Sequence, residues 1–468
     1  MSEGAAKKER PRSFQAIRGV RDLLPDQTSL WNFVERIAHE TFATFGFGEI
    51  RLPLFERTDL FARSIGEDTD VVSKEMYTFL DPPAWLEILE KLGAVKDVDR
   101  TATTFTIKNH LPNENFIAEV LSLRPEATAS ACRAYIEHNM QQLPQPVKLY
   151  YMGPMFRRER PQKGRYRQFY QIGAEVLGGG DAPAIDAEVI EMVMTFFDRL
   201  GLEGVQLHIN SIGDKNCRPK YVELLREELQ KVKDKLGPDS RRRIDTNPLR
   251  VLDSKLESEQ ETIEKLPRIT QHLCDSCRDN YDEVKRQLAI RGINYSQNFR
   301  LVRGLDYYMR TTFEITAKGL GSQNAVCGGG RYDGLLELLG GPPTKGIGFA
   351  IGEDRLILSL QESGKAPAQQ GRDVYIAWMG ERAQATAIRA AKDLRKAGFS
   401  VELPPVEQKF GKALGQADKL GAKYALILGD NEVSEGLWTL KMLADGSQAK
   451  FTEPDLLEHL RKQKALSS

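Results

Sequence analysis

The chain has 468 residues, of which 41% are hydrophobic, and its 66 basic side chains balance 66 acidic ones. This length exceeds what one compact core accommodates, and the composition is that of an ordinary globular protein, so we expect two or three domains. The apolar runs fall short of a membrane span and no apolar leader is present, which predicts a cytoplasmic protein without membrane contact.

In chain order, the first half of the sequence predicts one long helix followed by strands. Residues 30–44 have apolar side chains at helical spacing and end at a glycine-marked stop. Residues 49–55 have the character of a strand, and Pro53 within them limits this strand to a sheet edge or a dimer-facing position. Residues 147–158 and 167–178 predict an antiparallel hairpin, because two strand-like runs flank a short polar loop.

The second half adds helices, further strands and one distinct helical segment. Helices are predicted at 186–200 and 353–360, and strands at 205–210, 299–308, 311–316 and 347–351. Strands joined by hairpins, with the helices gathered elsewhere, predict an antiparallel α+β core. Residues 214–291 are dense in Lys, Glu, Arg and Leu with helical spacing, and predict an inserted helical subdomain.

A polar linker rich in Gly, Pro, Ala and Gln, residues 361–371, separates residues 1–360 from residues 372–468. In the last segment, strands are predicted at 373–378, 400–403 and 424–428, and helices at 382–396 and 412–420. This alternation predicts a separate small α/β domain with a largely parallel sheet.

The hairpin carries the densest group of positive charges. Six basic residues fall within eleven positions: Arg157, Arg158, Arg160, Lys163, Arg165 and Arg167. Strand alternation sets Phe169, Gln171, Gly173 and Glu175 on one face. Since arginine keeps its charge and forks onto oxyanions, this face suits a purine phosphate together with a cationic group. A solvated basic loop explains the charge run alone equally well.

A second segment, residues 123–128, places a carboxylate and a hydroxyl just before an apolar helix. Glu126 and Thr128 are therefore candidates for binding a ligand. The simpler explanation is a helix N-terminus, with Pro125 in the first turn and Glu126 favoured there by the helix dipole.

A third segment contains Arg303, a glycine that allows close backbone approach, and the pair Tyr307 and Tyr308. On a strand, the two tyrosines would offer one hydroxyl on each face. The alternative is a strand end with a single ion pair between Arg303 and Asp306.

Two further segments are suited to anions. Residues 327–334 predict a glycine-rich turn whose N–H groups could cradle an anion. Arg355 follows Gly352 at the start of a predicted helix, where geometry and dipole both favour an anion.

The five cysteines are an odd, scattered set and predict no disulfide framework. Cys274 and Cys277 form half of a zinc-like pattern, but no second cysteine pair or histidine pair completes it. His272 adjoins this pair and Cys217 is remote along the chain, so the sequence predicts no metal site.

Taken together, these segments resemble the bacterial-type histidyl-tRNA synthetases, members of the class II aminoacyl-tRNA synthetases. Residues 18–25 look like the family's opening segment, 47–75 like the dimerisation element motif 1, 156–178 like motif 2 and 346–356 like motif 3. Residues 301–310 and 327–334 resemble two signatures of the histidine enzymes. The resemblance implies a class II antiparallel-sheet catalytic core with a helical insertion, and a C-terminal α/β anticodon-binding domain.

The resemblance also implies a reaction and its participants. The histidine carboxylate attacks the α-phosphate of ATP to give histidyl-adenylate and pyrophosphate, and the histidyl group then passes to the 3′ end of tRNA(His). Mg²⁺ is expected with ATP, and a homodimer is expected from motif 1. Positioning and charge stabilisation carry most of such catalysis, which fits an arginine-rich site without an obvious general base.

The residue roles follow from the matching motifs. Arg157 and Arg303 are the expected catalytic residues. The expected ATP site comprises Arg157, Arg165, Phe169 and Arg355. The expected histidine site comprises Glu126, Ala127, Thr128, Arg157, Gln171, Glu175, Arg303, Tyr307 and Tyr308. Glu175 with the tyrosines is expected to read the imidazole, since a buried ring with two nitrogens needs a carboxylate and a hydroxyl to satisfy it.

Two features depart from the family pattern. Ala127 stands where the family usually has glycine, a change that we expect to be tolerated. Between Phe79 and Leu121 the chain carries roughly 35 residues more than the family's usual short turn, which indicates an inserted segment. Within this insert, residues 81–90 predict a helix and 104–108 a strand.

In the tail domain, five lysines are expected to face RNA: Lys409, Lys412, Lys419, Lys423 and Lys441. The alternative to a ligase is a synthetase-like regulatory subunit that senses histidine and charges nothing. Such proteins keep the fold but typically lose the tail domain and the catalytic arginines, both of which are present here.

Overall fold

The computed structural model describes residues 14–66, 69–80, 120–318, 324–364 and 371–467. The chain divides into two compact units, Met1–Ala366 and Pro367–Ser468. Among the described residues, no helix is long and apolar enough to cross a membrane.

The N-terminal unit is built on an eight-stranded sheet in the order β1-β5-β6-β11-β10-β9-β7-β8. The strands are β1 (Gly48–Glu49), β5 (Val147–Phe156), β6 (Gln168–Leu177), β7 (Gln206–Ser211), β8 (Ser296–Gln297), β9 (Met309–Thr316), β10 (Ala325–Arg331) and β11 (Gly346–Gly352). The two outermost pairs are parallel and the five pairs between them antiparallel. The predicted antiparallel α+β core is confirmed, and β5 and β6 form the predicted hairpin.

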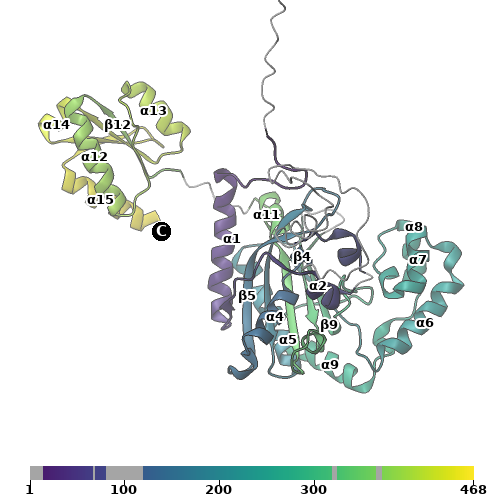
Figure 1. Cartoon of the computed structure of the whole chain (residues 1–468). Helices are drawn as coiled ribbons and strands as arrows, with labels where there is room; N and C mark the ends of the chain where they lie inside the picture. The colour runs from purple at the N-terminus through teal and green to yellow at the C-terminus, as the bar shows by residue number, and fades with distance from the viewer. Residues whose placement is uncertain (1–13, 67–68, 81–119, 319–323, 365–370, 468) are drawn as a thin grey trace, which may run out of the picture. The chain divides into compact units, whose positions relative to one another are not determined.

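One face of the sheet is covered by helices α1 (Pro25–Thr44), α5 (Pro183–Arg199), α9 (Asp275–Ile290) and α11 (Glu353–Glu362), which are labelled in Figure 1. Apolar side chains of alternate strand residues, such as Ile172 and Phe349, pack there against Phe42 and Phe196. Because strand side chains alternate, Phe169, Gln171 and Glu175 of β6 lie on the opposite face. This face carries the polar residues.

A small three-stranded sheet flanks that polar face. It consists of β2 (Phe55–Arg57), β4 (Val120–Leu123) and β3 (Thr78–Leu80), with β4 in the middle. Helix α2 (Thr58–Ile65) follows β2 along the chain, and helix α4 (Thr128–Glu137) follows β4. Leu80 and Val120 are paired across β3 and β4, so the inserted segment leaves and returns at one point. The helix predicted at 81–90 and the strand predicted at 104–108 lie outside the described residues.

The predicted helical insertion contains α6 (Arg218–Lys231), α7 (Pro238–Thr246) and α8 (Glu257–Glu264), grouped to one side in Figure 1. These helices have a core of their own that includes Leu225 and Ile263. Helix α9 joins two cores, because Cys277 in its first turn belongs to the insertion core while Val284 and Leu288 belong to the sheet core. The insertion is therefore anchored to the sheet through α9.

The strand predicted at 49–55 is wrong over most of its length, because only Gly48–Glu49 pairs with β5. The guanidinium of Arg124 donates to the carbonyls of Leu52 at 2.9 Å and Pro53 at 3.2 Å. These carbonyls are therefore engaged by a side chain, and strand pairing resumes only at Phe55.

The strand predicted at 299–308 is also wrong, because this segment is irregular and β9 begins only at Met309. The Leu301 N–H turns back to the Asn298 carbonyl, and the Asp306 N–H donates to the Ile65 carbonyl. Arg310, just after it, has a left-handed φ of 49°. The backbone is therefore held by contacts that residue periodicity does not indicate.

The predicted glycine-rich turn at 327–334 begins instead as a central strand. Gly328, Gly329 and Gly330 lie within β10, which pairs with β9 on one side and β11 on the other. Their backbone groups belong to the sheet and form no anion cradle. Because these glycines have no side chains, neighbouring groups can lie close to them. A Cβ at Gly328, for example, would meet the Arg303 guanidinium.

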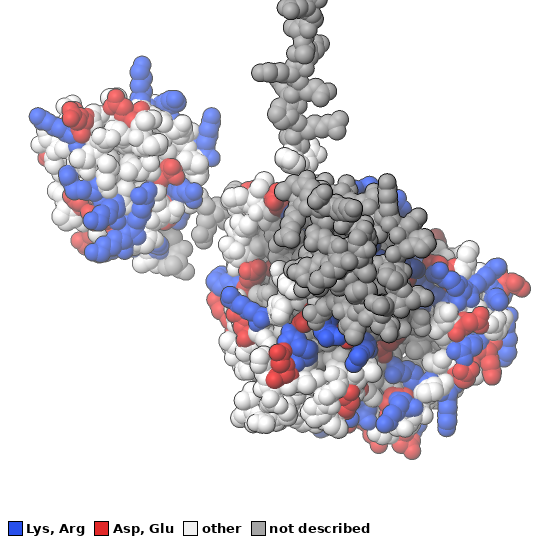
Figure 2. All heavy atoms as spheres, viewed as in Figure 1, with Lys and Arg blue, Asp and Glu red and all other residues white. Residues whose placement is uncertain are grey.

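The C-terminal unit has a five-stranded sheet in the order β13-β12-β14-β15-β16. Its elements are β12 (Val374–Met379), α12 (Glu381–Lys396), β13 (Val401–Glu402), α13 (Phe410–Lys419), β14 (Tyr424–Gly429), α14 (Asp430–Glu435), β15 (Trp438–Met442), β16 (Gln448–Phe451) and α15 (Glu453–Ser467). The first three strands are parallel, as predicted, whereas β15 and β16 add an antiparallel hairpin that was not predicted. Figure 2 shows many exposed Lys and Arg side chains on this unit, in blue.

A buried ion pair connects the sheet to α5. Arg331 at the end of β10 is 1% exposed and pairs with Asp186 of α5, which is fully buried, and with Asp333 at 3.0 Å. Two carboxylates and one guanidinium hold each other in place where water does not reach, so removing Asp186 leaves the guanidinium short of one partner.

We expect Asp186→Ala to lower the free energy of unfolding of the N-terminal unit by about 3–5 kcal/mol, the usual cost of breaking a buried pair on one side. Urea unfolding followed by fluorescence measures this change. Glu261→Ala removes an exposed partner of Lys265 and serves as the control, with an expected loss below about 1 kcal/mol. Equal losses in the two variants would contradict the structural role of Asp186.

Candidate active site

A cavity of about 310 Å³ lies on the polar face of the large sheet. Its lining brings together residues from the β5–β6 hairpin, the start of α4, the irregular segment 301–308, β9 and α11. The predicted site residues that line it are Glu126, Thr128, Arg157, Arg165, Phe169, Gln171, Arg303, Tyr307, Tyr308 and Arg355. Of the predicted residues, Ala127 and Glu175 lie behind this lining, and both are fully buried.

Glu126 combines the two roles that its sequence allowed. Its carboxylate accepts the backbone N–H groups of Thr128 at 2.7 Å and Ala129 at 3.0 Å, and thereby caps α4. The same side chain lines the cavity. Burial raises the pKa of Glu126, while these N–H groups favour its charged form. Ala127 supplies the buried backbone turn at the start of the helix.

Glu175 is the centre of a buried hydroxyl network. Its Oε1 accepts the hydroxyls of Thr128 at 2.8 Å and Tyr151 at 3.1 Å, and its Oε2 accepts the Tyr332 hydroxyl at 2.5 Å. Burial raises the pKa of Glu175 to about 8, although these hydroxyls favour the ionised form. Three elements therefore converge on one carboxylate directly beneath the cavity.

Tyr151 and Tyr332 are functional candidates that sequence reasoning missed. Tyr151 pairs with Gly173 across the hairpin, which places it beside Glu175. Only the exact hairpin register could have revealed this neighbour. Tyr332 lies inside the segment 327–334, where the glycines dominate the sequence pattern and the single aromatic residue does not stand out.

Arg157 is oriented by the backbone and by an aromatic ring. Its Nε donates to the Pro125 carbonyl at 2.9 Å, and its guanidinium lies 5.3 Å from the centre of the Phe169 ring. Its Nη1 is 3.8 Å from Glu159. With Nε fixed on a carbonyl, the Nη groups remain for an oxyanion ligand.

Arg165 and Arg355 line the same end of the cavity. Arg165 is 3.4 Å from Glu159, and Arg355 donates to the Ala325 carbonyl at 3.1 Å and to the Gly164 carbonyl at 3.4 Å. Burial, and then the nearby charge of Arg165, lowers the pKa of Arg355. Positive charges that raise one another's energy are stabilised by an anion, so this end of the cavity suits phosphates.

Arg303 reaches the cavity from the irregular segment. It lies 3.4 Å from Glu314 of β9, rather than forming the ion pair with Asp306 that the sequence allowed, and its guanidinium is 5.6 Å from the Tyr308 ring centre. Its Nε and the Oε1 of Gln171 are buried without a hydrogen-bond partner among the described residues. Unsatisfied buried polar atoms in a cavity favour a polar ligand.

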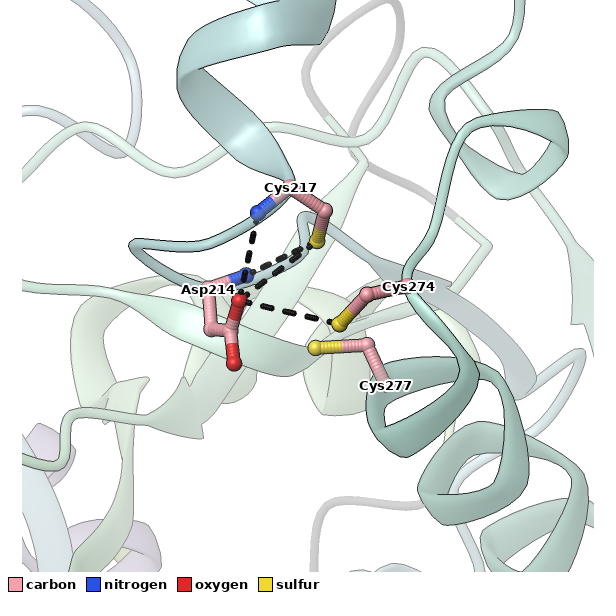
Figure 3. A group of neighbouring side chains, drawn as sticks. All are labelled: Asp214, Cys217, Cys274 and Cys277. Carbon is pink, nitrogen blue, oxygen red and sulfur yellow. Dashed lines mark hydrogen bonds between the residues drawn. The ribbon is translucent and has the colours of Figure 1, made fainter.

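The cysteine prediction needs a correction. Cys217 is remote in sequence, but its sulfur joins those of Cys274 and Cys277 and a carboxylate oxygen of Asp214 (Figure 3). The four ligand atoms lie within 4.8 Å of one another. His272 contacts Tyr221 instead, with ring centres 5.8 Å apart. The missed signal is the spacing Asp214-x-x-Cys217, which matches that of the second pair.

An antiparallel sheet flanked by helices, with arginines from a strand hairpin and from the helix after the last sheet strand meeting in one cavity, defines a class II aminoacyl-tRNA synthetase. The family model for histidyl-tRNA synthetase matches residues 69–356, and that for an anticodon binding domain matches residues 373–463. The chain therefore belongs to the histidyl-tRNA synthetase family.

Curated relatives and solved structures agree with this assignment. The chain is 49% identical to the histidine–tRNA ligase of Solibacter usitatus over 95% of this chain and 98% of that one. It is 47% identical to the ligase of Koribacter versatilis over 96% and 97%. Apo S. aureus histidyl-tRNA synthetase superposes with a TM-score of 0.74 at 35% identity, covering 96% of this chain and all of that chain.

The raised pKa of Glu175 predicts a pH-dependent contribution to stability. The folded chain holds a proton on Glu175 up to about pH 8, whereas the unfolded chain loses it near 4.5. Between these values the folded state binds more protons, so the contribution of Glu175 to the free energy of unfolding falls as pH rises.

We expect Glu175→Gln to remove this dependence. The stability of the variant relative to the wild type should increase by on the order of 4 kcal/mol between about pH 4.5 and pH 8. Parallel urea titrations of both proteins across this range measure the difference. A constant difference at all pH values would show that Glu175 titrates normally.

Proposed function

We propose that this chain is a histidine–tRNA ligase that activates L-histidine with ATP and transfers it to the 3′ end of tRNA(His). In the first step a histidine carboxylate oxygen bonds to the α-phosphorus and pyrophosphate leaves. In the second, a hydroxyl of the terminal adenosine takes the histidyl group and AMP leaves. The single observation that carries the proposal is one cavity with the guanidinium groups of Arg157, Arg165 and Arg355 at one end and a buried carboxylate–hydroxyl network beneath the other.

The cationic end accounts for ATP. Arg157 clamps the α-phosphate and the histidine carboxylate, and Arg165 and Arg355 hold the outer phosphates. Phe169 stacks on the adenine, which its position in the lining of the cavity supports. Fixed arginines act by placing charge where the transition state needs it, without reorganisation.

Mg²⁺, when bound together with ATP, would neutralise part of the charge of the phosphates. The carboxylates of Glu159 and Glu314 line the cavity and are the oxygen donors that fit this ion. They would hold the ion together with the phosphates. Arg303 stabilises the pentavalent phosphate. The neighbouring carboxylate of Glu314 orients the Arg303 guanidinium.

The other end accounts for histidine. Glu126, Thr128 and Gln171 receive the α-amino group, and the unpartnered Gln171 Oε1 supports this role. Glu175, Tyr307 and Tyr308 recognise the imidazole. Glu175 lies behind the lining, so it acts partly through the hydroxyls that it orients. A side chain without ring nitrogens could make no hydrogen bonds with these polar groups, which is a strong basis for discrimination.

The C-terminal unit is proposed to bind the anticodon part of the tRNA. Lys409, Lys412, Lys419 and Lys423 are exposed there, and Lys441 is half-buried. Exposed lysines bind the phosphate groups of an RNA backbone, and such contacts do not distinguish one base sequence from another.

Two wider features complete the proposal. The chain works as a homodimer, which the resemblance of residues 47–75 to motif 1 and the exposed Leu54 and Phe55 support. It works in the cytoplasm, where free thiols such as its five cysteines persist.

A histidine-sensing regulatory subunit is the second candidate. A chain described as an ATP phosphoribosyltransferase regulatory subunit/histidyl-tRNA synthetase from Bacillus halodurans C superposes with a TM-score of 0.58 at 19% identity, which is a likeness of fold alone. A purely regulatory subunit has no need for Arg157, Arg303 and Arg355 in one cavity. The ligase is therefore favoured.

A charging assay separates the two functions. Purified protein with ATP, Mg²⁺, labelled histidine and tRNA(His) should accumulate histidyl-tRNA, and tRNA lacking its terminal adenosine should not be charged. Histidine binding without any charged tRNA would support the regulatory subunit instead.

We expect Arg303→Ala to abolish adenylate formation while the protein stays folded. Loss of a fixed positive charge at the reacting phosphate costs about two to three orders of magnitude in rate. Single-turnover formation of histidyl-adenylate measures it. Arg242→Ala, which removes an exposed arginine of α7, is the matched control with unchanged rate. Near-normal adenylate formation by folded Arg303→Ala would remove Arg303 from the mechanism.

We expect Glu175→Gln to raise the KM for histidine by roughly 10- to 100-fold and to leave the KM for ATP nearly unchanged. The amide places donors where hydroxyls already donate, so the network must break or rotate. Steady-state kinetics with each substrate varied in turn measures the two constants. An unchanged KM for histidine would mean that Glu175 supports the fold and does not contribute to recognition.

A further inference from the structure

A compact group of potential metal ligands lies outside the cavity described above, between the large sheet and the helical insertion. It comprises Asp214, Cys217, Cys274 and Cys277, drawn in Figure 3. The three cysteines are free thiols. None of these residues takes part in the proposed binding of ATP, histidine or tRNA, so the group calls for a separate explanation.

The spacing of the group matches a tetrahedral ion. Ligands about 2.3 Å from zinc in tetrahedral geometry are about 3.8 Å apart. Asp214 Oδ1 lies 3.6 Å from the Cys217 sulfur and 3.9 Å from the Cys274 sulfur. All four ligand atoms, including the Cys277 sulfur, lie within 4.8 Å of one another. The group is thus already close to the dimensions of a four-coordinate site.

Two segments with the same ligand spacing build the group. Asp214-x-x-Cys217 leads into α6, and Cys274-x-x-Cys277 begins α9, so Cys217 and Cys274 are the residues just before each helix. Gly213 has a φ of 65°, and a Cβ there would approach the Cys217 sulfur to 2.7 Å.

Hydrogen bonds and charge around the group suit anionic ligands. The Asp214 N–H donates to the Cys217 sulfur at 3.4 Å, and the Asn216 N–H donates to Asp214 Oδ1 at 2.9 Å. The guanidinium of Arg310 lies 4.0 Å from Asp214 Oδ2. Three thiolates and a carboxylate on a divalent ion carry a net charge of −2, which one arginine partly offsets.

We propose that Asp214, Cys217, Cys274 and Cys277 bind one Zn²⁺ ion as a structural site. A set of three soft thiolates and one carboxylate selects zinc over magnesium or calcium, which prefer oxygen ligands. Four protein ligands leave no open position for a substrate, so the site has no catalytic role. Each thiol gives up its proton as its sulfur binds the ion, so binding releases three protons and weakens as pH falls.

The position of the site gives it a mechanical role. It joins the starts of α6 and α9, and thus both ends of the insertion, to one point beside the sheet. The Arg310 N–H donates to the Gly213 carbonyl at 2.8 Å, and Arg218, directly after Cys217, donates to the Tyr308 carbonyl at 2.6 Å. The ion would therefore also brace the segment that carries Arg303, Tyr307 and Tyr308.

Metal content of the full-length protein, purified without a metal-affinity tag, tests the proposal directly. We expect about one equivalent of zinc per chain by elemental mass spectrometry. Replacement by Co²⁺ should give the visible absorption bands of a tetrahedral thiolate site. Protein that lacks zinc as purified, and binds none on dialysis against Zn²⁺ under reducing conditions, would overturn the proposal. So would a disulfide among these three cysteines in protein purified anaerobically.

Matched variants locate the ion. Cys274→Ser should lose the zinc and the cobalt bands, whereas Asp214→Cys should retain both because it substitutes one zinc ligand for another. Cys132→Ser changes a buried cysteine outside the group and should keep a full equivalent of zinc. Should Cys274→Ser fail to fold, the cobalt spectrum of the wild type still decides, since a spectrum without thiolate bands excludes these ligands. Retention of zinc by folded Cys274→Ser would equally contradict the assignment.

Discussion

The burial of Glu175 is the constraint on which the rest of the active site depends. A carboxylate removed from water must be surrounded by donors, and here Thr128, Tyr151 and Tyr332 supply them from α4, β5 and the end of β10. The neighbouring strand β11 must also have a glycine at position 348, since a Cβ there would collide with the Glu175 carboxylate. One buried acidic group thus dictates the residues of several separate elements.

Much of this arrangement could be predicted from sequence, because it depends on local pattern. The hairpin, the shared face of Phe169, Gln171 and Glu175, and the convergence of the arginines follow from strand alternation and from motif spacing. The confirmed α+β core follows from the same pattern. The capping of α4 by Glu126 is likewise visible in the residues around Pro125.

What sequence could not predict depends on long-range contact. The segment 299–308 looks like a strand, but the backbone contact of Asp306 with Ile65 holds it in an irregular path. The glycines of β10 look like a turn, but they are a strand whose missing side chains admit Arg303. The matching spacing of Asp214-x-x-Cys217 and Cys274-x-x-Cys277 is visible in the sequence, but only the structure shows that the two segments lie side by side. Periodicity describes a single element and not its neighbours.

The geometry of this cavity leads us to expect that it activates histidine and no other amino acid. Amino-acid-dependent exchange of pyrophosphate into ATP, measured with each standard amino acid separately in the presence of Mg²⁺, tests it most directly because it needs no tRNA. We expect exchange with histidine alone. Exchange with a different amino acid, or none from folded protein, would contradict it.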